Sequence, residues 1–147
     1  MSRSPLDEAF DYASARLKEE GGDVFRLPVP LQTVVVVYSA QGIIDNGGLE
    51  YFYESDFDGF PPYGFFVDAY RRIGAEDAAS CIETSAAMFP FSEPHLSETS
   101  RQVWLDSVKH DESNQFVKLS RKICGDPSIF PKLAEYVNAH RHAFQAV

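Results

Sequence analysis

The chain has 147 residues, 44% of them hydrophobic and 14% aromatic, and its formal net charge at pH 7 is −9. This length and apolar content fit one compact domain spanning residues 1–147 and exclude a disordered chain. The negative charge argues against direct binding of nucleic acid, because phosphate groups would be repelled.

The N-terminus and the two cysteines predict a soluble, cytoplasmic protein. Residues 1–5 lead directly into charged sequence without an apolar segment, so no signal peptide is expected. The longest strongly apolar run covers residues 34–38, which is far too short to cross a membrane. Cys81 and Cys124 lack CxxC spacing, and we expect both to be reduced and buried.

The first predicted element is an amphipathic helix. Ser4 is a suitable N-cap, Pro5 stands in the first turn, and two acidic residues follow. The apolar residues that recur at helical spacing are Leu6, Phe10, Ala13 and Leu17. Gly21 and Gly22 end the helix.

The next run, residues 31–45, has two interpretations. Residues 33–38 are largely β-branched, which is typical of a buried strand. No hairpin partner follows, however, and apolar residues also fit a helical face, so we predict a central helix that is apolar on all sides. Residues 46–48 break this helix, and residues 49–54 form a short second one.

Further helices are predicted in the rest of the chain. After a turn-rich loop at residues 56–62, helical patterns end near Gly74 and at Pro90. Ser97 and Ser113 are predicted to cap the next two helices, and Asp126 begins a last helical region. The prediction is therefore an all-α fold, a single compact domain of seven or eight short helices without a strand pair.

No motif for metal binding or catalysis is found. The four histidines lack zinc-type spacing: His140 is expected in the core, and His110 is expected in a solvated turn. There is no nucleophile, phosphate-loop or dinucleotide motif either. We therefore expect no metal, no other cofactor and no enzymatic activity. A small enzyme that uses loop carboxylates is the alternative from another functional class.

Acidic residues dominate the stretch between Arg26 and Arg71, which contains no lysine or arginine. The acids of this stretch are Asp45, Glu50, Glu54, Asp56, Asp58 and Asp68. Glu50 and Glu54 are separated by about 6 Å along a helix, which is on the scale of successive phosphates in one DNA strand. Such a row could occupy the basic surface of a DNA-binding protein. In the alternative interpretation the acids surround a solvated loop and contact nothing.

Aromatic residues are concentrated in the same region. They are Tyr53, Phe57, Phe60, Tyr63, Phe65 and Phe66. Aromatic side chains beside acidic ones suit a protein–protein contact, including a homodimer. Alternatively, these rings belong to the core and anchor the loop.

Residues 46–52, Asn-Gly-Gly-Leu-Glu-Tyr-Phe, resemble the signature of a bacterial protein family that includes the neisserial DNA-mimic protein. Residues 73–75 and the alanine-rich residues 78–87 also resemble that family, so the resemblance covers about residues 30–90. It implies an all-helical fold. For one member it implies an acidic surface that imitates DNA and occupies a transcription factor.

The signature itself predicts structure rather than chemistry. Gly47 and Gly48 are expected to take positive φ at a junction between helices, and Asn46 is expected to cap the second helix. The apolar residues expected to pack in the core are Leu49, Tyr51 and Phe52.

The sequence thus favours a non-enzymatic protein-binding domain, with a DNA mimic that captures a basic nucleic-acid-binding protein as the leading hypothesis. The six acids would bind the partner, and the loop aromatics would supply apolar anchors. An immunity-like or antitoxin-like protein that blocks a toxin is the alternative within binding. No membrane partner is expected.

Overall fold

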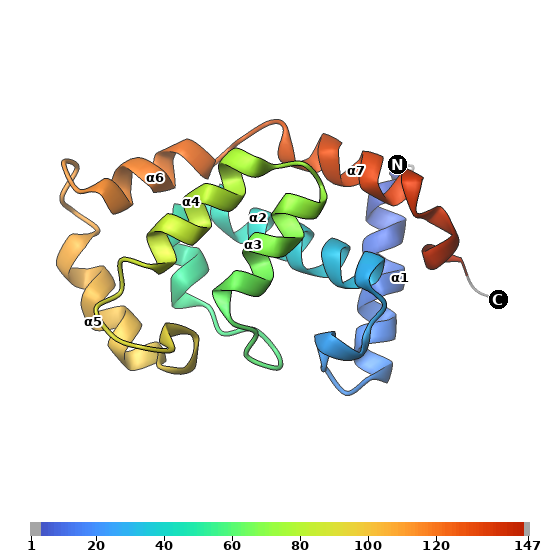
Figure 1. The fold of residues 1–147 in the computed structure, drawn as a ribbon, viewed down its shortest axis with the longest axis horizontal. Helices are drawn as coiled ribbons and strands as arrows, with labels where there is room; N and C mark the ends of the chain where they lie inside the picture. The colour runs from blue at the N-terminus through green and yellow to red at the C-terminus, as the bar shows by residue number, and fades with distance from the viewer. Residues whose placement is uncertain (1–3, 146–147) are drawn as a thin grey trace.

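One long helix, α2 (Val29–Glu54), runs through the middle of the molecule, and the other helices pack around it (Figure 1). A computed structural model describes residues 4–145. The other α-helices are α1 (Pro5–Glu19), α3 (Tyr63–Arg72), α4 (Glu76–Ala86), α5 (Glu98–Val108), α6 (Gln115–Ile123) and α7 (Ile129–Ala139). The short 3-10 helices are η1 (Val24–Arg26), η2 (Pro94–Leu96) and η3 (Arg141–Phe144). Residues 4–145 contain no strand, which confirms the all-α prediction.

The helices are distributed toward two ends of an elongated molecule. In Figure 1, α1 and α7 lie at one end and α5 and α6 at the other, while α3 and α4 pack against each other across the middle. Among the residues described, no helix is long and apolar enough to cross a membrane.

The predicted start of α1 is confirmed. The Asp7 amide donates to Ser4 Oγ over 3.1 Å, and the Ser4 amide donates to Asp7 Oδ2 over 3.4 Å, so the two residues form a capping box. Leu6 and Ala13 are buried, and the Phe10 ring stacks on Tyr38 with 4.0 Å between ring centroids. The apolar face of α1 therefore closes one side of α2.

The first part of α2 is the centre of the core, as the helical interpretation of residues 31–45 predicted. The apolar side chains in this part that are fully inaccessible to solvent are Leu31, Val34, Val37, Ala40 and Ile44. The β-branched run forms a helix because α1, α3, α6 and α7 all pack against α2 and bury its apolar side chains on several faces.

A buried amide ties three helices together. Gln41 Nε2 donates to the carbonyl of Ile123 at 3.0 Å and to Asp45 Oδ1 at 2.7 Å, while Gln41 Oε1 accepts from the Tyr70 hydroxyl at 3.0 Å. Asp45 Oδ1 also accepts from the Gly125 amide at 2.7 Å. Burial raises the pKa of Tyr70 well above its ordinary value, so its hydroxyl stays a donor.

Two predicted helix starts are wrong by a short distance. Asn114, rather than Ser113, caps α6, because its Oδ1 accepts from the Phe116 amide at 2.8 Å. Asp126 does not open α7 but accepts from the Ser128 amide at 2.9 Å, which forms a turn just before the helix. The predicted cap at Ser97 is confirmed, since its hydroxyl accepts from Ser100 N.

Two burial predictions are also wrong. Cys81 is buried as expected, but Cys124 is exposed because it follows the last turn of α6, where the chain leaves the core. His140 is exposed as well, because it follows the last turn of α7, and its Nδ1 lies 2.8 Å from the carbonyl oxygen of Tyr136. His110 is exposed, as predicted.

The aromatic stretch is mainly core, which favours the alternative interpretation of these rings. Tyr53, Tyr63 and Phe66 are buried, and burial raises the pKa of Tyr63 to about 12. Only Phe60 in this set is largely exposed, at 53%. The loop aromatics therefore hold the segment between α2 and α3 against the core.

Candidate protein-binding surface at the end of α2

The helix α2 changes direction at the Asn-Gly-Gly signature. Gly48 has a φ of 73°, which favours glycine, as predicted. Gly47 has a φ of −153°, which any residue can adopt, so the predicted positive φ is wrong there. Gly47 is needed for a different reason: a Cβ atom on it would lie 2.2 Å from the ring of Tyr51.

The helical turn after the kink is capped from outside α2. The Leu49 amide donates to Ser120 Oγ, which comes from α6, over 2.9 Å. A Cβ atom on Gly48 would lie 2.3 Å from the same hydroxyl oxygen, so glycine also permits this close approach. The predicted cap residue, Asn46, lines a surface hollow, and its predicted capping role is taken by Ser120.

The turns after the kink have an inner and an outer face. Leu49 and Phe52 are buried as predicted, and Tyr53 points inward, where its hydroxyl lies 2.6 Å from Ser85 Oγ. Tyr51 is 50% exposed, so the prediction that it packs in the core is wrong. On a helix the spacing i, i+3, i+4 gathers residues 49, 52 and 53 on one face, which turns Tyr51 outward.

The outer face carries a cluster of carboxylates that are only partly neutralised. Lys109, at the end of α5, lies 3.6 Å from Glu50 Oε1 and 3.0 Å from Asp106 Oδ1. Partial burial and the neighbouring Glu50 raise the pKa of Glu54, and Lys109 offsets this only in part. Glu50 and Asp106 therefore share one ammonium group between α2 and α5, and Glu54 lies next to Glu50 without an ion pair to Lys109.

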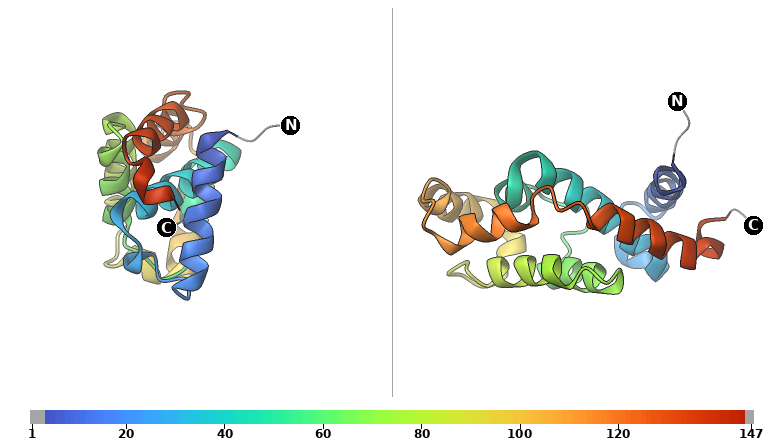
Figure 2. Two further views of the ribbon diagram at one scale, coloured as in Figure 1. Left: turned by 90° about the vertical axis from the view of Figure 1, so that its right-hand side faces the viewer. Right: turned by 90° about the horizontal axis from the view of Figure 1, so that it is seen from above.

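A hollow of about 730 Å³ lies beside this cluster. It is lined by Ile43, Asn46, Tyr51, Glu54 and Ser55. All five come from α2 or the residue that follows it. Figure 2 shows the teal C-terminal part of α2 at the rim of the molecule, on the side away from α3 and α4.

Two of the other predicted acids serve the fold. Asp45 receives hydrogen bonds from Gln41 and the Gly125 amide, as described above. Asp56 Oδ1 lies 2.6 Å from the guanidinium of Arg101, whose side chain is only 1% exposed. Both carboxylates are thus already bound to groups within the chain.

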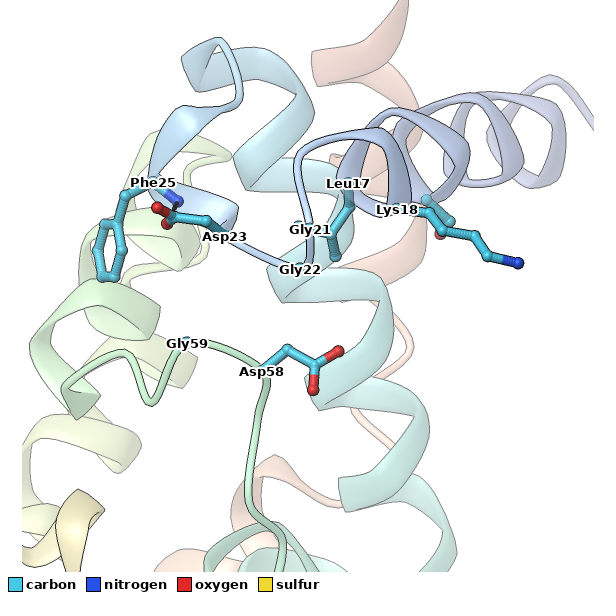
Figure 3. A pocket seen from close by; sticks show the side chains of 9 residues that line it. Leu17, Lys18, Gly21, Gly22, Asp23, Phe25, Asp58 and Gly59 are labelled. Atoms are coloured by element: carbon cyan, nitrogen blue, oxygen red, sulfur yellow. Dashed lines mark hydrogen bonds between the residues drawn. The ribbon is translucent and has the colours of Figure 1, made fainter.

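Asp58 and Asp68 lie apart from the pair of glutamates. Asp68 is exposed on α3. Asp58 lines a second hollow of about 750 Å³, together with Leu17, Lys18 and the turn at Gly21 and Gly22. Figure 3 shows Asp58 on the loop after α2, facing that turn. The structure therefore brings Glu50 and Glu54 together. Of the other four predicted acids, Asp45 and Asp56 are bonded within the chain, and Asp58 and Asp68 lie elsewhere on the surface.

Arg101 was missed in the sequence, although it organises this end of the molecule. Its Nε donates to the carbonyl of Tyr53 at 2.7 Å, and its Nη1 donates to the carbonyl of Pro94 at 2.8 Å. The available signal was its position four residues before the buried Leu105 on a predicted helix, which places both on the inner face.

An apolar groove of about 380 Å³ lies on the outside of α5. Its largest lining side chains are Phe91, Val103 and Trp104. Val103 is 68% exposed. Among residues 4–145, no group of three or more His, Cys, Asp or Glu side chains is arranged to hold a metal ion.

The model of the DMP19-like protein family matches residues 25–140. This chain belongs to the DMP19-like protein family. The match includes the kink, the paired glutamates and Arg101, and it excludes α1. Comparison with curated proteins gives no match, and neither does comparison with solved structures. Membership in the DMP19-like family confirms the resemblance drawn from the Asn-Gly-Gly signature.

Proposed function

We propose that this chain is a non-enzymatic protein-binding domain whose acidic surface takes the place of DNA phosphates on a basic nucleic-acid-binding protein. The observation that carries the proposal is the cluster of Glu50, Glu54 and Asp106, which Lys109 neutralises only in part. The net charge of −9 and membership in the DMP19-like family support it.

The binding surface is smaller than the six acids predicted from the sequence. Asp45 and Asp56 hold α2 to its neighbours, so their carboxylates are less available to a partner. Asp58 and Asp68 are peripheral acids that add to the long-range attraction of a basic protein. Glu50, Glu54 and Asp106 form the central contact.

A small enzyme would also place a carboxyl group of raised pKa in a hollow, as Glu54 does. The hollow beside Glu54 offers little else for catalysis. Its other lining residues include no second carboxylate, imidazole, amine or thiol, and the Ser55 hydroxyl donates to the Tyr51 carbonyl at 2.8 Å. One carboxylate beside an aromatic ring suits binding of a cation better than proton transfer.

A partner that binds nucleic acid also implies a location in the cytoplasm.

The first test is capture of partners from host lysate by the immobilised chain. The variant is Glu50→Gln with Glu54→Gln. Its matched control is Glu8→Gln with Glu135→Gln, which removes the same charge from α1 and α7 at the other end of the molecule (Figure 1). We expect a basic DNA-binding protein to be retained at low salt by the wild type and the control, and lost with the variant.

Two further conditions separate mimicry from other binding. High salt releases the partner, because the contact is electrostatic, and added double-stranded DNA releases it by competing for the same basic surface. A retained protein that ignores both DNA and the loss of the two glutamates would overturn the proposal. If that protein were a toxin without affinity for nucleic acid, the immunity-like alternative would replace it.

A further inference from the structure

We propose that the hollow lined by Tyr51 and Glu54 binds one cationic side chain of the partner, with arginine as the preferred ligand. The inference rests on the proposed function for the identity of the partner. The site itself rests on the geometry of the Asn-Gly-Gly signature and of the hollow beside it.

The Tyr51 ring packs against Gly47 although it is half exposed. It lies so close to Gly47 that a Cβ atom there would come within 2.2 Å of the ring atoms Cγ and Cδ2. The backbone of Gly47 does not itself require glycine, because its φ is −153°. The absence of a side chain at Gly47 therefore permits this position of an exposed aromatic ring.

A carboxylate shares the hollow with this ring. Glu54 follows Tyr51 by three residues on the same helix, so the two side chains lie on one face. Lys109 pairs with Glu50 and Asp106 rather than with Glu54. Partial burial and the neighbouring Glu50 raise the pKa of Glu54, while Lys109 and a hydrogen bond with Gln102 lower it in part. A cation in the hollow would add to this compensation.

These groups match the chemistry of a guanidinium ion. A cation is attracted to the face of an aromatic ring within about 6 Å, and arginine can stack flat on it. A carboxylate can accept two parallel hydrogen bonds from the same guanidinium. Ile43, at the edge of the hollow, offers apolar surface to the methylene stem.

The identity of the ligand follows from the proposed partner. A protein that binds DNA presents arginine and lysine side chains to phosphate oxygens. The Glu50–Glu54 cluster would attract such side chains over a distance, and the hollow would then accept one of them. The hollow thus adds a fixed position to an attraction that otherwise depends on charge alone.

The test uses variants that keep every charge. Gly47→Ala should push the Tyr51 ring out of its place. Gly42→Ala is the matched control, because Gly42 lies in the same helix and a Cβ atom on it would have no neighbour within 4 Å. Tyr51→Leu removes the aromatic face, while Tyr51→Phe keeps it. These two variants change an exposed side chain and keep the test valid if Gly47→Ala disturbs folding.

The probe is a short oligo-arginine peptide, with an oligo-citrulline peptide of the same length as the neutral control. NMR titration follows the Tyr51 ring and the Glu54 carboxyl resonances. We expect oligo-arginine to shift both, and its affinity to fall roughly two- to five-fold in Gly47→Ala and Tyr51→Leu but not in Gly42→Ala or Tyr51→Phe. Shifts spread evenly over all acidic residues, or equal affinity in all variants, would overturn the proposal.

Failure of this inference can be distinguished from failure of the proposed function. If the captured partner is lost with the Glu50/Glu54 variant but retained by Tyr51→Leu at unchanged affinity, the hollow plays no part and the DNA-mimic function stands. If oligo-arginine binds at Tyr51 but no DNA-binding protein is captured, the cation site stands and the proposed function fails.

Discussion

The two parts of α2, before and after the kink at Gly48, differ in what holds them and in what they expose. Before the kink, side chains such as Val34, Val37 and Ile44 are fully buried. After it, inward residues alternate with outward Glu50, Tyr51 and Glu54. In Figure 2 the later part reaches the rim of the molecule. One helix therefore provides both the centre of the core and the candidate binding surface.

The comparison shows that the two parts depend on different interactions. The first part is fixed by apolar burial against its neighbours. The second is short and is held at both ends by side chains from elsewhere: Ser120 at its first turn and Arg101 at its last carbonyls. Changes at Ser120 or Arg101 should therefore act first on the candidate binding surface.

The largest effect is expected in the core part. Replacing Ile44 by Ala removes buried methyl groups from a fully inaccessible site and should lower the free energy of unfolding by about 3–4 kcal/mol. Ile43→Ala, one residue away at the edge of the surface hollow, should cost less than about half of this. Chemical denaturation measures both, and equal losses would contradict the contrast between the two faces.

Arg101→Met should destabilise the protein by about 3 kcal/mol, because it leaves the carbonyls of Tyr53 and Pro94 without a donor and Asp56 without its cation. The matched control is Arg121→Met, which removes an exposed arginine paired with Glu112 and should change stability little. Amide hydrogen exchange should show increased exchange at the end of α2 first. Uniform exchange across the chain would show that Arg101 supports the whole fold instead.

A smaller effect is expected at the start of the second part. Ser120→Ala removes the acceptor for the Leu49 amide and should cost about 1 kcal/mol, as does the loss of a helix N-cap. Ser80→Ala, at an exposed position on α4, serves as the control. If Ser120→Ala leaves the melting temperature unchanged, water replaces the hydroxyl at no cost.

The smallest effect concerns pH and the binding surface. Because the pKa of Glu54 is raised in the folded state, its ionisation works against folding at neutral pH, and this cost is absent once the carboxyl is protonated. Glu54→Gln should therefore be slightly more stable than the wild type at neutral pH. The difference should disappear below about pH 4, where the wild-type side chain is neutral. A gain that persists in acid would have another origin.

Local signals in the sequence were enough to predict most of the fold. The Ser4 cap and the stripe from Leu6 to Leu17 predicted α1, and the apolarity of residues 31–45 without a hairpin partner predicted a central helix. These features depend on neighbouring residues in the chain, so composition and spacing reveal them.

The missed features depend on contacts distant in sequence. Ser120 and Arg101 act on α2 from 71 and 48 residues away, and no local pattern announces such partners. The outward position of Tyr51 was different, because helical spacing from Leu49, Phe52 and Tyr53 already implied it. The prediction nevertheless placed Tyr51 in the core because its ring is largely apolar. Gly47, which makes room for this ring, belongs to the family signature.

The burial of Arg101 also has a consequence for the order of folding. Its guanidinium is costly to remove from water until its acceptors are assembled, and these lie on segments 7 to 48 residues away. We therefore expect this contact to form after the main kinetic barrier has been crossed. Loss of Arg101 should then accelerate unfolding while leaving the refolding rate nearly unchanged. The lifetime of the candidate binding surface would then be set by a side chain that does not belong to it.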